Sequence, residues 1–186
     1  MTIKLNSYSM WTEKKYEDDW YDWCVFVDED LEVINTIRSV EYTLHPTFPN
    51  PVRVIKDKTS RFVLFSSGWG GFRIKVRIDY ENGSSLKTSF SLQLLRDNWP
   101  KKQPPQDFSE NETKLVYQAL LHEKHRWRKI DTLVKNSNLP KDAVLRILEE
   151  LQNQDLARKA YYLSIDGKEM WGATAVVGVS PRISKS

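Results

Sequence analysis

Two short segments carry the residue types best suited to holding a flat, uncharged ligand. The first is Leu44–Pro49, in which Phe48 lies on a turn stiffened by two prolines, and the second is Ser67–Phe72, in which Trp69 lies between glycines. Proline fixes the backbone φ, whereas glycine tolerates positive φ and lets other groups approach the backbone closely. Two aromatic rings on separate turns favour a slot, because a planar group packs well against π faces.

The residue types needed for catalysis do not form a recognisable set. We find no Ser-His-Asp or Cys-His arrangement, phosphate-binding loop or carboxylate pair, so we expect no enzymatic activity and no cofactor. His122 and His125 have the spacing of two metal ligands, but no third ligand has a suitable spacing and several cations adjoin them, so we expect no metal. Cys24 lies in an apolar run, which predicts a buried thiol and no internal disulfide.

Composition is that of a globular protein, with 40% hydrophobic and 28% charged residues in a chain of 186. The net charge of +3 is too small to indicate nucleic-acid binding by itself. No apolar run approaches the roughly 18 residues that a membrane span needs. We therefore expect no membrane association and a cytoplasmic location, or a nuclear one if the source cell has a nucleus.

The first half of the chain has the pattern of β-strands. Arg73–Tyr80 alternates apolar with charged or polar residues, and an Asn-Gly turn leads to a returning strand at Leu86–Leu95. Shorter strands are predicted at Trp20–Val27, Ile37–Leu44, Val52–Ile55 and Arg61–Phe65. Several short strands separated by turns predict a mainly β domain, an antiparallel sandwich over residues 20–97.

A proline-rich linker is predicted at 98–108, because three prolines prevent regular structure there, and we expect so polar a segment to make few contacts. Residues 109–178 then have helical periodicity, followed by a hairpin. The predicted elements are a helix with a capping box at Ser109–Glu112 and an apolar face of Leu115, Val116, Ala119 and Leu120, a helix at Ile130–Lys135, a helix from Pro140 with a stripe of Val144, Ile147, Leu148 and Leu151, and strands at Leu156–Ile165 and Glu169–Val176. This α/β order resembles a small winged-helix domain.

The first half also resembles a known family. The motif His-x-Thr-Phe-Pro at 45–49, a strand, and then Gly-Trp-Gly-x-Phe at 68–72 resemble the YEATS domain, an immunoglobulin-like reader of acylated lysine. The resemblance covers residues 20–95. The binding residues that it implies are His45, Thr47, Phe48, Gly68, Trp69 and Gly70.

The resemblance also implies a role for each residue. Phe48 and Trp69 would be the facing rings of an aromatic cage, and the Thr47 hydroxyl would meet the acyl amide. Gly68 would open its turn, His45 would edge the slot, and the backbone of Trp69 and the following glycine would bond the amide oxygen. Acylation removes the lysine charge, so a slot without a carboxylate would select the modified side chain by desolvation.

These features favour a non-catalytic reader whose partner is an acylated-lysine peptide or protein, coupled to a winged-helix domain for protein–protein interaction. A second interpretation is a DNA-binding regulator with a sensory or docking sandwich, in which Arg126, Arg128 and Lys129 are the candidate nucleic-acid contacts. A third is a structural adaptor whose slot is filled by its own side chains. The mixed charges on Lys141–Leu151 predict weak DNA binding, if any.

Overall fold

The computed structural model describes residues 2–122 and 124–183. This part of the chain folds into two compact units. The first contains the residues up to Asn98 together with the segment that begins at Pro181, and the second contains Trp99–Ser180. Each unit has its own cluster of buried apolar side chains, so each is described by itself.

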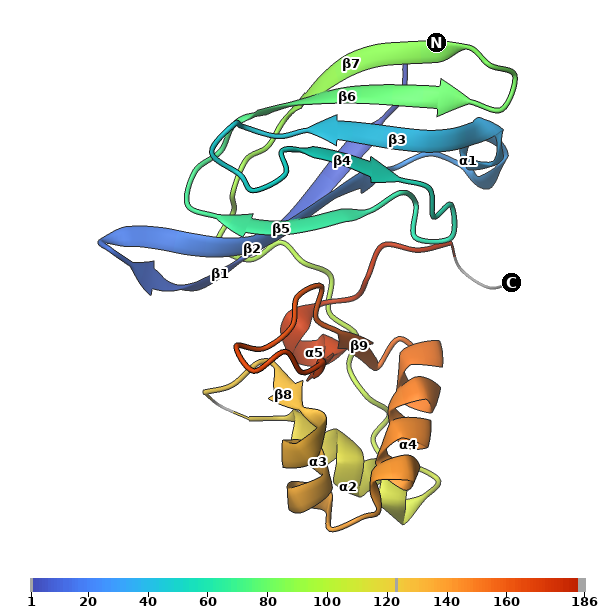
Figure 1. Ribbon diagram of the computed structural model, residues 1–186. Helices are drawn as coiled ribbons and strands as arrows, with labels where there is room; N and C mark the ends of the chain where they lie inside the picture. The colour runs from blue at the N-terminus through green and yellow to red at the C-terminus, as the bar shows by residue number, and fades with distance from the viewer. Residues whose placement is uncertain (1, 123, 184–186) are drawn as a thin grey trace. The chain divides into compact units, whose positions relative to one another are not determined.

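The first unit consists of two antiparallel sheets (Figure 1). One sheet has the strand order β1-β2-β5 and the other has the order β4-β3-β6-β7. A short helix, α1 (Leu31–Thr36), connects β2 with β3. The strands are β1 (Leu5–Lys15), β2 (Asp18–Val27), β3 (Ile37–Thr43), β4 (Val52–Ile55), β5 (Leu64–Gly68), β6 (Arg73–Tyr80) and β7 (Ser85–Ser91). Antiparallel sheets in this arrangement are consistent with an immunoglobulin-like fold.

Strand β6 confirms the prediction from its alternating sequence. Ile74, Val76 and Ile78 are buried in the core of the first unit, while the intervening basic side chains are exposed. The same core receives the fully buried Trp23 from β2 and Tyr42 from β3. Both sheets therefore contribute their inward-facing side chains to one apolar cluster.

The sequence did not predict β1, which pairs with β2 along most of its length. The first predicted strand began at Trp20. Strand β1 reads Leu-Asn-Ser-Tyr-Ser-Met-Trp-Thr-Glu-Lys-Lys, so its polar residues hide the alternation that reveals β6. Pairing with β2 overrides this weak local signal.

The predicted strand at Arg61–Phe65 is wrong in its first half. Arg61 and Phe62 both have positive φ, at 57° and 55°, so they form a turn and β5 begins only at Leu64. The buried hydroxyl of Tyr42 donates a hydrogen bond to the carbonyl oxygen of Phe62 at 2.9 Å. A tertiary contact thus helps to hold a backbone conformation that the β-branched and aromatic composition did not predict.

The second unit contains helices and a small antiparallel sheet with the strand order β8-β10-β9. Its elements are α2 (Asn111–Leu120), β8 (Arg128–Lys129), α3 (Ile130–Ser137), α4 (Lys141–Asn153), β9 (Ala157–Lys159), β10 (Met170–Ala173) and α5 (Thr174–Val177). The stripe predicted for α4 is confirmed, since all four of its apolar side chains are buried. They meet residues of α2, α3 and β10 in one core.

Three local predictions in the second unit are wrong. Helix α2 has Glu110 at its N-cap without a side-chain hydrogen bond, so there is no capping box. Leu115 is 37% exposed, and Tyr117 occupies the buried face in its place. Both hairpin strands are shorter than predicted: β9 ends at Lys159, not Ile165, and β10 ends at Ala173, where the chain turns into α5.

The segment 98–108 contains no helix and no strand, but it makes more contacts than its composition predicts. Trp99 is 4% exposed, and its indole N–H donates to the carbonyl oxygen of Val179 at 2.8 Å. The N–H of Val179 in turn donates to the carbonyl oxygen of Pro100 at 2.8 Å. Lys102 donates to the carbonyl oxygen of Gln154. The residues after Asn98 are therefore packed into the second unit.

Candidate functional site

The loop that carries the first motif connects β3 to β4 and is held at both ends. The N–H of Leu44 donates to the carbonyl oxygen of Pro51 at 2.8 Å, which extends the pairing of the two strands into the loop. The Arg53 guanidinium donates to the carbonyl oxygens of Pro49, at 2.6 Å, and Asn50. Within the loop, the N–H of Phe48 donates to the carbonyl oxygen of His45 in a turn. These hydrogen bonds hold the backbone that carries the side chains of the motif.

His45 and Thr47 lie next to each other on the exposed side of this loop. The Nδ1 atom of His45 lies 2.9 Å from the Thr47 hydroxyl oxygen. The backbone N–H of Thr47 also points at Nδ1, at 3.4 Å, so Nδ1 acts as an acceptor. With an unprotonated Nδ1, the Thr47 hydroxyl donates to the ring and keeps its own lone pairs for an incoming donor.

Phe48 is half-buried and packs against the edge of the core. Its ring centroid lies 6.1 Å from that of Trp23 in an edge-on arrangement, and 5.2 Å from that of Phe72 with a tilt of 37°. These contacts fix one side of the ring. Gly68 adjoins the ring, because a Cβ built on this glycine would lie 3.5 Å from Cζ of Phe48.

Trp69 follows directly after β5 and is 55% exposed. Its ring contact among the described residues is with Trp20, at 5.3 Å between centroids and a tilt of 36°. Phe48 packs near Gly68 and Trp69 follows it in the chain, but within the described part of the chain the two rings do not stack on each other. The structure brings the two predicted rings to one edge of the first unit.

The glycines of the second motif differ in how much space surrounds them. Neither Gly68 nor Gly70 has the positive φ that the motif suggested. A Cβ on Gly70 would meet no atom within 4 Å, so its surroundings are open. A Cβ on Gly71 would lie 2.6 Å from the carbonyl oxygen of Leu92, so the backbone approach demands glycine at this position.

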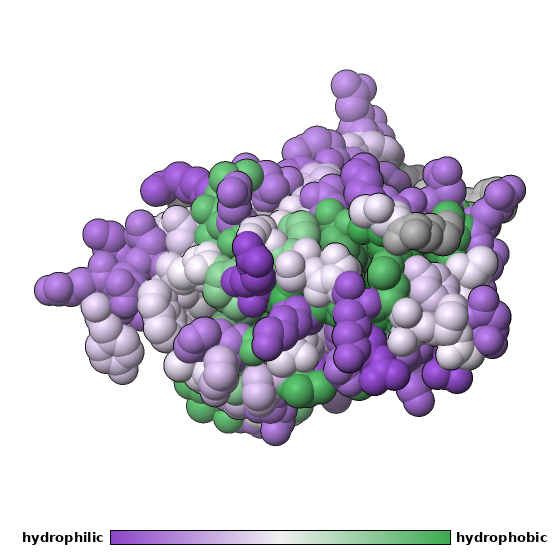
Figure 2. Space-filling model, turned by 90° about the horizontal axis from the view of Figure 1, so that it is seen from above, coloured by the Kyte–Doolittle hydropathy of each residue, from purple (hydrophilic) through white to green (hydrophobic). Residues whose placement is uncertain are grey.

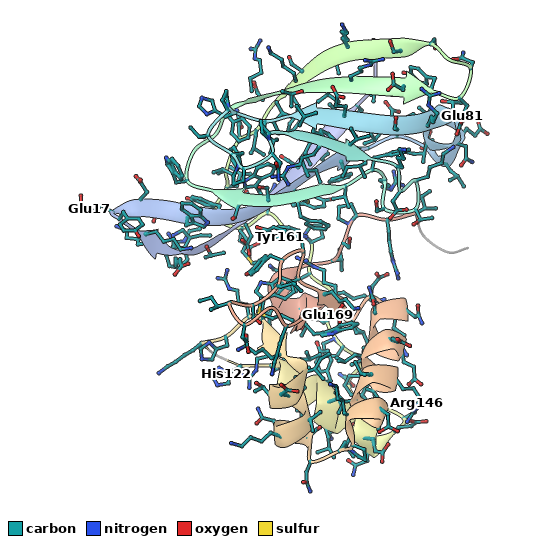
Figure 3. The ribbon with its side chains drawn as sticks, viewed as in Figure 1. Glu17, Glu81, His122, Arg146, Tyr161 and Glu169 are labelled. Atoms are coloured by element: carbon teal, nitrogen blue, oxygen red, sulfur yellow. The ribbon has the colours of Figure 1, made fainter. Side chains whose placement is uncertain are left out.

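Trp20 is the site residue that sequence reasoning missed. It lies on β2, in the hairpin formed by β1 and β2. The Lys15 ammonium lies over its indole, 4.8 Å from the ring centroid. Glu17, labelled in Figure 3, marks the tip of this hairpin. No local pattern indicated this residue, because a tryptophan at the start of a strand is ordinary and its partner Trp69 lies just after another strand, β5.

The basic residues proposed to contact nucleic acid have different environments. Arg128 is only 7% exposed, and its Nη1 atom has no hydrogen-bond partner among the described residues. Lys129 forms an ion pair with Asp166 at 2.7 Å. Arg126 is half-buried. On α4, Arg146, which Figure 3 labels, lies 3.1 Å from a carboxylate oxygen of Glu150.

His122 and His125 lie together, with ring centroids 4.9 Å apart. Across residues 2–122 and 124–183, no cluster of three or more histidine, cysteine or acidic side chains could hold a metal ion. The helices in those ranges are also too short or too polar to cross a membrane.

Comparison with known proteins identifies the first unit. Residues 21–93 match the family model of the prokaryotic YEATS domain. The chain is similar to the protein AF-9 homologs of Neurospora crassa, 32% identical over 83 residues, and of Saccharomyces cerevisiae, 38% identical over 78 residues. These matches cover 43% and 40% of this chain but only 27% and 33% of the relatives. The chain thus spans about a third of the length of these curated relatives or less.

Solved structures of YEATS domains match about half of this chain. One is the Yaf9 YEATS domain recognizing an H3K122suc peptide and another is the Yaf9 YEATS domain bound to H3K27ac, at 27% and 26% identity. Each has a TM-score of 0.39 and covers about half of this chain, at 50% and 51%, and 78% and 77% of its own chain. On the family match and the sequence similarity together, residues 21–93 of this chain resemble a YEATS domain of the prokaryotic type.

Proposed function

We propose that the first unit is a non-catalytic reader of acylated lysine, in which the acyl group enters between Phe48 and Trp69. The observation that supports this most strongly is the joint placement of two aromatic rings beside Gly68 and a threonine hydroxyl oriented by His45. The match to the YEATS family model supports the same ligand class.

The rings would supply most of the binding free energy. A lysine acyl amide is flat and uncharged, so it can pack against π faces. Burying about 100 Å² of its apolar surface would contribute roughly 2–3 kcal/mol at 25 cal/mol per Å². Phe48 is already held by the core, so little side-chain entropy is lost at that wall.

The site offers both a hydrogen-bond acceptor for the amide N–H and donors for the amide oxygen. The Thr47 hydroxyl oxygen, which lies 2.9 Å from Nδ1 of His45, would accept the hydrogen bond of the amide N–H. The N–H of Gly70, which makes no hydrogen bond within the described residues, would donate to the acyl oxygen together with the N–H of Trp69. Free lysine would lose water at this site and find no carboxylate among these residues, so it is disfavoured.

Amide chemical shifts provide a test that locates the ligand. An acetyl-lysine peptide added to the full chain should shift the resonances of Thr47, Gly70 and the Trp69 indole, and an unmodified peptide should leave them in place. Shifts confined to the second unit would contradict the proposal, since the ligand would then bind elsewhere.

For the second unit, we propose a winged-helix-like domain that contacts protein rather than DNA. The order of α2, β8, α3, α4, β9 and β10 and the three-stranded sheet support this architecture. The loop between β9 and β10 exposes apolar side chains, with Leu163 at 59% and Ile165 fully exposed. The burial of Arg128 and the ion pair of Lys129 make two of the three candidate cations less available to phosphates. Salt-sensitive DNA binding by the full chain would contradict this assignment.

A further inference from the structure

Strand β7 has one unoccupied edge. It is the last strand of the sheet β4-β3-β6-β7, in which it pairs with β6 alone, and Figure 1 shows it at the outer end of that sheet. The pairing runs without a register shift from Arg73 opposite Ser91 to Asp79 opposite Ser85. An edge strand of this length presents a row of backbone groups to any strand that lies beside it.

The hydrogen bonds that flank the pairing show which groups face outward. At one end, the N–H of Leu92 donates to the carbonyl oxygen of Phe72, and at the other end the N–H of Tyr80 donates to the carbonyl oxygen of Ser84. Both hydrogen bonds join even-numbered residues. Hydrogen-bonded pairs alternate with non-hydrogen-bonded pairs in an antiparallel ladder. The even-numbered residues of β7 therefore bond β6, and the odd-numbered residues direct both N–H and C=O away from the sheet.

Those outward-facing groups include the N–H and C=O of Lys87, Ser89 and Ser91. In the part of the chain that the structure describes, none of the three makes a backbone hydrogen bond beyond the ladder. None contains a proline ring that would block a new strand. These three residues, at every second position of the strand, thus offer the spacing of donors and acceptors that an added strand requires.

The outer face at this edge is basic. Lys87 lies directly opposite Arg77 on β6, whose guanidinium pairs with Asp79 at 3.0 Å, and like charges at such a position destabilise a sheet. Lys75 lies opposite Ser89, and within the described residues neither Lys75 nor Lys87 forms an ion pair. A shallow hollow of about 560 Å³ over this face is lined by these basic side chains and by Glu41. An acidic side chain beside Lys87 would relieve the repulsion.

The inner face at the same edge is apolar. Leu86 and Phe90 pack against the core of the first unit but are only half-buried, because no strand lies beyond them. Figure 2, which looks down on the side where β7 lies, shows hydrophobic patches between hydrophilic side chains. Apolar residues on an added strand would cover these two side chains.

We propose that the open edge of β7 binds an extended segment of a partner protein in which acidic and apolar residues alternate. The segment adds a strand to the sheet: its backbone bonds the odd-numbered residues, its carboxylates meet Lys75 and Lys87, and its apolar residues cover Leu86 and Phe90. This inference does not depend on the acyl-lysine proposal. It concerns the four-stranded sheet, and the aromatic rings play no part in it.

A second copy of the chain is a poorer occupant of this edge. Pairing β7 with β7 would bring the basic outer faces of two copies together and add to the repulsion between Arg77 and Lys87. Lysine on an edge strand is a recognised device against such self-pairing. The same charge attracts an acidic strand, so charge decides between the two occupants.

The test uses the full chain and a seven-residue peptide that alternates glutamate and valine. Binding is followed by the amide hydrogen exchange and chemical shifts of Lys87, Ser89 and Ser91, with a lysine–valine peptide as the charge control. We expect slowed exchange at these three amides with the acidic peptide only. Equal binding of both peptides, or protection elsewhere, would overturn the proposal.

Three variants sharpen the test. Ser89→Pro removes one outward N–H and leaves the ladder to β6 intact, so it should fold and weaken binding by about fivefold or more. Lys87→Glu should reverse the preference toward the lysine–valine peptide. Lys56→Glu, an equal charge change in the loop after β4, is the matched control and should bind as the wild type does. Full binding by a folded Ser89→Pro variant, or concentration-dependent dimerisation that Ser89→Pro abolishes, would contradict the acidic-segment occupant.

Discussion

Replacing Trp99 by alanine should destabilise the second unit while leaving the first folded. The ring is 4% exposed, its N–H bonds the carbonyl oxygen of Val179, and the Arg158 guanidinium lies 4.9 Å from its centroid. The ring also lies against Gly178, where φ is +76° and a Cβ would come within 2.1 Å of it. Truncating a buried tryptophan costs about 3–5 kcal/mol.

This loss is large for the second unit. A unit of its size has a free energy of unfolding of about 4–12 kcal/mol, so the variant should sit close to its unfolding transition at room temperature. The assay is native-state hydrogen exchange in urea, with the amide of Leu148 reporting on the second unit and that of Ile78 on the first. Trp69→Ala is the matched control, because its ring is exposed.

The two reporters give a clear outcome. We expect faster exchange at Leu148 in the Trp99→Ala variant, unchanged exchange at Ile78, and wild-type exchange at Leu148 in the control. A change of less than about 1 kcal/mol at Leu148 would refute the claim that the residues after Asn98 are part of the second unit.

Three other changes have defined outcomes. Gly71→Ala should lower the free energy of unfolding of the first unit by about 1–3 kcal/mol, because its Cβ would lie 2.6 Å from a backbone carbonyl oxygen, whereas Gly70→Ala should be neutral by denaturant unfolding. Thr47→Val should weaken acyl-lysine binding about fivefold in calorimetry by removing one acceptor, and Thr47→Ser should restore it. Lys129 and a serine hydroxyl lower the pKa of Asp166 to about 2. Its stabilising effect is therefore present above about pH 4 and lost as the pH falls through 2, which amide exchange in the β9–β10 loop should report.

The sequence predicted the elements in which apolar residues recur with the regular period of a strand or a helix. Strand β6 and helix α4 each expose one face and bury the other, so periodicity alone placed Ile78 and Leu148 correctly. It could not find β1, whose polar residues are held by pairing with β2. It also misplaced the start of β5, since the positive φ of Arg61 and Phe62 depends on contacts distant in sequence.

The candidate site was predictable only as a set of residue types. Two motifs indicated Phe48 and Trp69, because proline and glycine beside aromatic rings have few structural explanations. They could not indicate Trp20, whose contact with Trp69 arises from strand pairing. The basic run around Arg128 resembled a solvated loop, but β8 buries that side chain, since alternate residues of a strand face opposite sides.

Calorimetry with crotonyl-, acetyl- and unmodified-lysine versions of one peptide tests the central claim most directly, using the wild type, Trp69→Ala and Phe48→Ala. We predict weak binding of both acylated peptides, tighter for the flat crotonyl chain, and at least about tenfold weaker binding of free lysine. Each alanine variant should stay folded by circular dichroism and lose most of the affinity. Equal affinity for modified and free lysine, or full binding by folded Trp69→Ala, would contradict the assignment of these rings as the reader.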